Sequence, residues 1–186
     1  MSGSRDTEYT EYVAARLSSL RRLAAVLCGD WQRADDLVQS TLAKLYVHWG
    51  RVRAADHADA YARSVLVHEF IHERRSGWAR RVSLDGHVID GPAAAVDQDA
   101  VLDLRAAVAA LPARQRATLV LRFYCDLNVD QSAAILGCSP GTVKSQTARA
   151  LDSVRRALEP APDAGHARAP AGPAEHKVYR GSPSHD

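Results

Sequence analysis

A pattern that can bind zinc lies in the first half of the chain. The segment His68-Glu69-Phe70-Ile71-His72 matches H-E-x-x-H, which places two histidines one helical turn apart with a glutamate beside them as a base. A catalytic zinc also needs a third protein ligand, and no glutamate occurs between Glu73 and Glu159. The remaining candidates are His87, Asp85 and Asp90. A zinc hydrolase is therefore a weak alternative, and we expect neither a metal site nor a cofactor.

Two short basic segments stand out in a chain of 186 residues whose net charge is only +2. The first lies between residues 74 and 84, contains no acid, and holds Arg74, Arg75, Arg80 and Arg81. The second lies between residues 139 and 158, where one acid, Asp152, faces Lys144, Arg149, Arg155 and Arg156. Local clusters of this kind indicate contacts with phosphates.

The second basic segment belongs to a predicted helix-turn-helix over residues 128–158. A helix of about nine residues ends at Gly137, which accepts the left-handed conformation of a tight turn. Ser139 and Pro140 are typical of the cap and first residue of a following helix. At 100° per residue, the core side holds Val143, Thr147, Ala150 and Val154. The small, polar and basic outer side suits a helix that enters a DNA major groove.

Helical periodicity covers most of the rest of the chain. Asp30 is a candidate cap for a second helix, on which apolar residues recur from Ala34 to Trp49. Gly50 to Ala58 is predicted to be a loop. The predicted helices outside the helix-turn-helix span residues 6–28, 30–49, 59–75, 99–110 and 112–124, with Pro112 as the first residue of the last. The fold class is therefore all-α.

Composition divides this helical chain into two small domains. Residues 83–98 hold Gly86, Gly91 and Pro92 without helical periodicity, which predicts a flexible linker. The predicted domains are residues 1–82 and residues 99–159. Residues 160–186 are rich in proline, alanine and glycine, and we expect a disordered tail.

The sequence LPARQRATLVLRFYCDLNVDQSAAILGCSPGTVKSQTARALDSVRRAL resembles the DNA-binding C-terminal domain of bacterial sigma factors of the extracytoplasmic-function (ECF) type, especially the actinobacterial branch. The segment RADDLVQSTLAKLYVHW resembles the core-polymerase-binding helix of the same family. The likeness spans about residues 9–158. It implies a factor that binds the clamp helices of core RNA polymerase, opens the downstream promoter element, and recognises the upstream element as duplex.

The resemblance and the helical geometry together assign candidate contacts. The core polymerase contacts are Asp35, Asp36 and Gln39. The upstream-element contacts are Thr142, Lys144, Ser145, Gln146 and Arg149. The loop from Gly50 to Ala58 matches the position where the family captures a flipped base, which costs a few kcal/mol of stacking. The downstream contacts, on the melted non-template strand, are Arg51, Arg53, His57, Arg63, His68, Arg74 and Arg75.

Other features of the sequence indicate the cellular location and the kinds of partner. Cys28, Cys125 and Cys138 form no CxxC pair, so we expect reduced thiols in a cytoplasmic protein. No apolar run is long enough to cross a membrane. The second alternative is a helix-turn-helix regulator that binds DNA without core polymerase, although such a protein has no need of the acidic-polar helix face. An anti-sigma factor would be a separate chain, and the sequence leaves that partner open.

Overall fold

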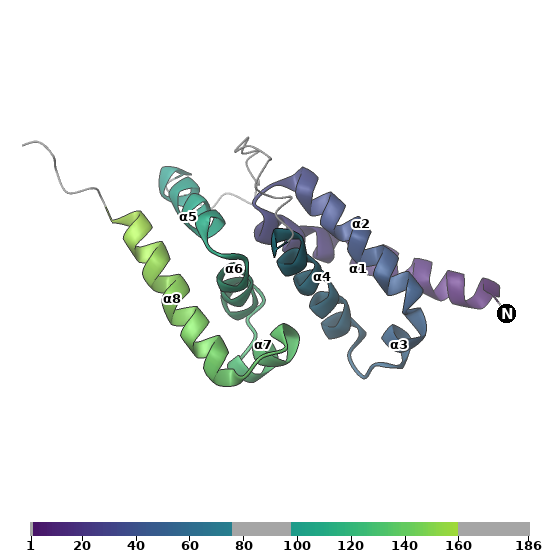
Figure 1. Ribbon diagram of the computed structural model, residues 1–186. Coiled ribbons are helices and arrows are strands. Elements are labelled where there is room, and N and C mark those ends of the chain that lie inside the picture. The colour runs from purple at the N-terminus through teal and green to yellow at the C-terminus, as the bar shows by residue number, and fades with distance from the viewer. Residues whose placement is uncertain (1, 76–97, 160–186) are drawn as a thin grey trace, which may run out of the picture.

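The computed structural model describes residues 2–75 and 98–159, and every regular element within them is helical (Figure 1). The N-terminal group consists of α1 (Ser2–Cys28), α2 (Trp31–Val47), α3 (Trp49–Ala54) and α4 (Ala58–Arg75). The C-terminal group consists of α5 (Gln98–Ala110), α6 (Ala113–Leu119), the π-helical turn η2 (Val120–Tyr124), α7 (Val129–Leu136) and α8 (Pro140–Leu158). The predicted tail and the predicted linker lie outside the described residues, except that Gln98 begins α5.

Local sequence signals fix the junction between α1 and α2. Gly29 ends α1 with φ at 76°, a left-handed conformation that glycine adopts without a side-chain clash. The Asp30 carboxylate then accepts hydrogen bonds from the backbone N–H groups of Gln32 and Arg33, which caps α2. The helix α1 packs against α2, and α2 packs against α4. The predicted apolar stripe of α2 is buried at Ala34, Leu37, Val38, Thr41 and Leu45.

The prediction of a loop from Gly50 to Ala58 is wrong, because residues 49–54 form α3. Trp49 and Val52 lie one helical turn apart, and both are buried in the core. That burial stabilises a short helix despite Gly50, which has open space around its Cα. Only residues 55–57 connect α3 to α4, so Arg51 and Arg53 lie on a helix and His57 alone of the three lies in the connection.

The C-terminal group begins as predicted, except that one helix starts one residue later than expected. Pro112 is the cap of α6 and not its first residue, since its extended conformation precedes the helix. The predicted helix does reach Tyr124, but its last five residues form η2. Asn128 and Gln131 form the expected capping box of α7, each side chain accepting a hydrogen bond from the other's backbone N–H. The three cysteines are free thiols, and burial raises the pKa of Cys125.

Arg116 joins the two groups of helices at a fully buried position. Its guanidinium donates to the backbone oxygen of Leu27 at 2.8 Å and to those of Ala109 and Leu111. The oxygens of Leu27 and Ala109 belong to the last turns of α1 and α5, where helical carbonyls lack partners within their own helix, and Leu111 directly follows α5. The guanidinium also lies 5.7 Å from the centre of the Phe70 ring of α4. Arg116 therefore caps two helices from different halves of the chain.

Apolar contacts extend the same junction. The helix α4 packs against α6 and α7, and the three lie together in the middle of the molecule (Figure 1). One continuous apolar core includes Leu66 and Phe70 of α4 together with Leu121 of η2 and Ile135 of α7. A second, smaller core lies between α5, α6 and α8. One of the two apolar cores therefore includes residues of both groups.

Replacing Arg116 tests the importance of this junction. We expect Arg116→Met to lower the free energy of unfolding by about 3 kcal/mol, because several buried carbonyls lose their donor while the side-chain volume is largely kept. Urea denaturation followed by circular dichroism measures the change. The control is Arg114→Met, since Arg114 lies on the same helix but is exposed. Equal stability of the two variants would show that the buried guanidinium contributes little.

Candidate DNA and polymerase interfaces

The helix α8 is divided into a buried side and an exposed side, as the sequence predicts. Val143 and Ala150 are fully buried and Val154 is 9% exposed, and all three face the rest of the C-terminal group. Lys144, Ser145 and Arg149 are exposed on the opposite side. Lys144 and Arg149 form no ion pair with any described residue, so both cations are available to a ligand.

The N-terminal end of α8 is held by its own hydroxyl groups. Ser139 accepts a hydrogen bond from the backbone N–H of Thr142, and the two hydroxyls lie 2.9 Å apart. Ser145 donates to the backbone oxygen of Thr142 at 3.0 Å. These contacts order the first two turns, which are the part of a recognition helix that meets base edges. Gln146 and Thr142 are half-buried at the edge of the exposed side.

Gly137 sets the path from α7 to α8. Its φ of 60° is left-handed, and its backbone N–H donates to the oxygen of Ala133 to close α7. The next residues lead directly to the Ser139 cap. The predicted turn geometry is therefore confirmed, and it presents the exposed side of α8 to solvent.

The outer face of α2 carries the predicted polymerase contacts. Asp36 and Gln39 are exposed, whereas Asp35 is half-buried in an ion pair. The Arg21 guanidinium holds Asp35 through two hydrogen bonds, Nε to Oδ1 at 2.7 Å and Nη2 to Oδ2 at 2.9 Å. This hydrogen-bonded pairing raises the pKa of Arg21. Asp36 and Gln39 are thus more accessible to a partner protein than Asp35 is.

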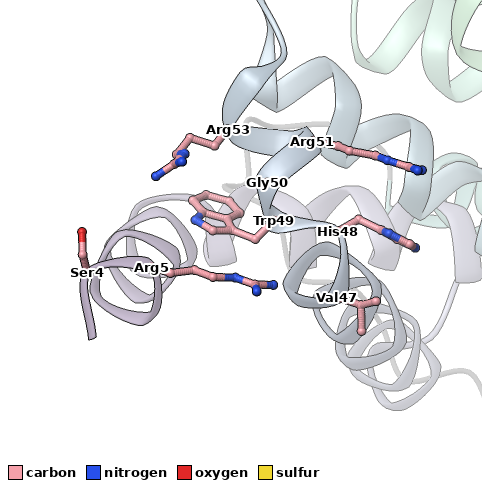
Figure 2. Close-up of a pocket in the computed structure, with 8 residues that line it drawn as sticks. All are labelled: Ser4, Arg5, Val47, His48, Trp49, Gly50, Arg51 and Arg53. Carbon is pink, nitrogen blue, oxygen red and sulfur yellow. The ribbon is translucent and has the colours of Figure 1, made fainter. Parts of the chain in front are cut away.

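The predicted downstream contacts are spread over α3, the connection after it, and α4. Arg51, His57 and His68 are exposed, and Arg63 is half-buried. Arg53 forms an ion pair with Glu8 of α1 at 2.9 Å, and its hydrogen bond lowers the pKa of that glutamate. The helix α4 ends at Arg75, and the side chains of Arg74 and Arg75 lie outside the described residues. The structure therefore places Arg51 and Arg53 on α3 with their side chains directed apart (Figure 2), His57 in the connection, and the others along α4.

Known protein families match both groups of helices. The sigma-70 region 2 family matches residues 12–80, and the sigma-70 region 4 family matches residues 102–154. An RNA polymerase sigma-E factor of Streptomyces avermitilis is 34% identical over 82% of this chain and 86% of its own length. The ECF sigma factor EcfG of Rhodopseudomonas palustris is 32% identical over 78% of this chain and 82% of its own.

The chain belongs to the ECF family of RNA polymerase sigma factors. A solved structure shares the fold: the sigma factor RpoE of Bartonella quintana, crystallised with the anti-sigma factor NepR, aligns with a TM-score of 0.61 and 28% identity. That alignment covers 81% of this chain and 96% of RpoE. As a sigma factor, the protein binds core RNA polymerase and directs promoter-specific initiation of transcription. In the part of the chain that the structure describes, no helix is both long and apolar enough to span a membrane.

The glutamate of the H-E-x-x-H pattern contacts a lysine in the structure. Glu69 accepts a hydrogen bond from Lys44 Nζ at 2.5 Å, which joins α4 to α2. His68 and His72 are both exposed. Residues 2–75 and 98–159 hold no group of three potential metal ligands, and the candidate third ligands, residues 85, 87 and 90, lie outside those ranges. Glu69 thus has a structural partner that the pattern alone did not indicate.

Sequence reasoning missed a hollow beside α3. It has a volume of about 610 Å³ and is lined by Ser4, Arg5, Val47, His48, Trp49, Gly50, Arg51 and Arg53 (Figure 2). Arg51 and Arg53 were expected contacts, but Arg5 comes from the start of α1, more than forty residues away. Nothing in the spacing of the sequence indicates that Arg5 lies there, because only the packing of α1 against α2 brings it close.

The Gly137 turn offers a test of the helix-turn-helix geometry. We expect Gly137→Ala to lower the free energy of unfolding by about 1 kcal/mol, because an L-residue is strained at this left-handed φ even though the site has open space. Gly137→Asn is the matched control and should cost less, since asparagine tolerates this conformation. Thermal unfolding of both variants measures the difference. An alanine variant as stable as the wild type would contradict the left-handed turn.

Proposed function

We propose that the sigma factor recognises the upstream promoter element through the exposed side of α8, using Thr142, Lys144, Ser145, Gln146 and Arg149. The division of α8 into an aliphatic buried side and a small, basic exposed side carries this proposal. Short side chains allow the helix to approach the base edges, and Arg149 can reach a guanine in the major groove. Lys144 supplies a phosphate contact that fixes the helix in register.

The same proposal assigns the outer face of α2 to core polymerase. Asp36 and Gln39 are exposed and point away from the core that Leu37 and Val38 enter. Asp35 is the third contact and already has the partner Arg21. A cationic surface on the polymerase would therefore add to the charge of Asp36 and compete with Arg21 for Asp35. This face distinguishes the proposal from a regulator that binds DNA alone.

The downstream element is assigned to α3, His57 and α4. Arg51, Arg53, His57, Arg63, His68, Arg74 and Arg75 would hold the melted non-template strand by its phosphates and compensate the cost of unstacking a base. In this scheme residues 1–82 form the polymerase-binding domain and residues 99–159 form the duplex-binding domain. The protein acts in the cytoplasm and catalyses no reaction of its own. The family membership and the exposure of Arg51, His57 and His68 support the assignment of the downstream element.

Arg149 provides the test of the α8 interface. We expect Arg149→Ala to weaken binding to the upstream duplex by about 1–3 kcal/mol if the guanidinium contacts a base edge. Footprinting of the promoter with the assembled holoenzyme measures this change. Arg156→Ala is the control. Arg156 lies on the last turn of the same helix and donates hydrogen bonds to the backbone oxygen of Asp152 and the hydroxyl of Ser153. Unchanged protection with Arg149→Ala would contradict the proposed orientation of α8.

Asp36 provides the test of the α2 interface. We expect Asp36→Arg to reduce association with core polymerase at least tenfold, because the reversed charge is placed at the centre of the contact face. Pull-down with purified core polymerase measures the association. The control Glu11→Arg makes the same charge change at an exposed position of α1. Normal assembly of the Asp36 variant would show that the contact face lies elsewhere, and failure of the wild-type chain to bind would favour the DNA-only regulator.

A further inference from the structure

The two groups of helices exchange hydrogen bonds at the ends of their helices. Arg116 of α6 donates to the backbone oxygen of Leu27, in the last turn of α1. Ser64 of α4 donates in the opposite direction, to the backbone oxygen of Ile135 in the last turn of α7, at 3.4 Å. Carbonyls at a helix C-terminus lack partners within their own helix. Each group therefore caps a helix of the other.

This junction can open without leaving a polar group unsatisfied. Water would satisfy the oxygens of Leu27 and Ile135 once the groups separate, and the Arg116 guanidinium would regain its hydration. The apolar side chains that oppose opening include Phe70 of α4 and Leu121 of η2, which belong to one core. Opening therefore costs mainly apolar burial, and a ligand with a higher affinity for the separated groups can offset that cost.

The arrangement in which α4 packs against α6 and α7, called closed below, restricts a proposed DNA contact. Arg63, one of the downstream set, is half-buried and directly precedes Ser64 of the junction. It lines a groove of about 390 Å³ together with Tyr124 and Cys125 of the C-terminal group. Because residues of both groups form this groove, the C-terminal group limits the access of a DNA strand to Arg63.

The two promoter-binding helices lie close together in the closed arrangement. The helix α4 packs against α7, and α7 packs against α8, so α4 and α8 are two helix-packing distances, or about 20 Å, apart (Figure 1). That distance equals about six base pairs of duplex at 3.4 Å each. The connection from Arg75 to Gln98 can span up to about 75 Å, so the chain permits a much larger separation.

We propose that the closed arrangement is autoinhibitory and that the two groups of helices separate when the protein binds a promoter. The reciprocal caps and the shared core hold the free chain closed. Only the promoter complex uses α4 and α8 at once, so the junction lowers the affinity for a whole promoter and leaves the affinity for the upstream duplex alone unchanged. This inference rests on the proposed function, which assigns the two elements to α8 and α4.

A distance measurement tests whether the groups separate. Spin labels are attached to unnatural residues at Ala14 of α1 and Ala157 of α8, which are both exposed. Pulsed electron paramagnetic resonance gives the distance between the labels in the free full chain and in its complex with core polymerase and a promoter fragment. We expect the distance to increase in the complex by at least about 17 Å, the length of five additional base pairs.

Replacing Ser64 weakens the junction at its cap. Ser64→Leu removes the donor to Ile135 and does not fit the 3.4 Å gap between the two oxygens, so the closed arrangement becomes less favourable. We expect its holoenzyme to bind the whole promoter at least about threefold more tightly than the wild type. The free chain should bind a duplex with only the upstream element as the wild type does. Gel-shift titration measures both affinities.

The control is Ser18→Leu, which makes the same change at an exposed position of α1 outside the groove. Both of its affinities should equal those of the wild type. We avoid Arg116 in this test, because it also donates to Ala109 and Leu111 within its own group. The label measurement uses the wild-type contacts, so it decides the matter even if Ser64→Leu fails to fold.

The outcomes separate this proposal from the proposed function. An unchanged label distance in a complex whose footprint covers both promoter elements would overturn autoinhibition and leave the proposed function standing. The same holds if Ser64→Leu binds the upstream duplex normally but gains no affinity for the whole promoter. A wild-type holoenzyme that protects neither element would refute the proposed function and this proposal with it.

Discussion

The buried guanidinium of Arg116 is the interaction on which the arrangement of the two halves depends. A positive charge without water is costly, and here the backbone oxygens of Leu27, Ala109 and Leu111 surround it. Helix C-termini carry partial negative charge, so the ends of α1 and α5 are suited to a cation. Because each helix end comes from a different half of the chain, satisfying the arginine also fixes how the halves meet.

This junction leaves the proposed interfaces free. The contacts between the halves use α4, α6, α7 and the end of α1, whereas the exposed sides of α2 and α8 lie outside them. The helix α3, which lines the hollow, lies on the side of the molecule away from α8 (Figure 1). The proposed interfaces on α2 and α8 thus lie on different groups of helices, which are joined by a shared apolar core. A mutation in that core would alter their relative placement without touching any contact residue.

Local signals in the sequence predicted most of the helices and the helix-turn-helix. Asp30, Asn128 and Ser139 act within three residues of their own positions, so spacing alone identifies them as caps. Signals that depend on tertiary packing were not predictable. The segment around Gly50 looked like a loop because burial of Trp49 and Val52 is not visible in a short stretch. Arg116 lies in a polar, basic stretch of sequence, which predicts exposure. It is buried because the ends of α1 and α5, which are far apart in the sequence, both pack against it.

The helix α5 is held less firmly than the helices that follow it. Its buried contacts come from Ala107 near its end and from Leu111 just after it, while Leu102 and Leu104 are 44% and 46% exposed. Elements with little buried apolar surface have the lowest free energy of local unfolding. Each residue released from the start of α5 would lengthen the connection between the domains by about 2 Å. Opening of α5 is therefore expected to begin at its first turn, while α6 to α8 stay folded on α4.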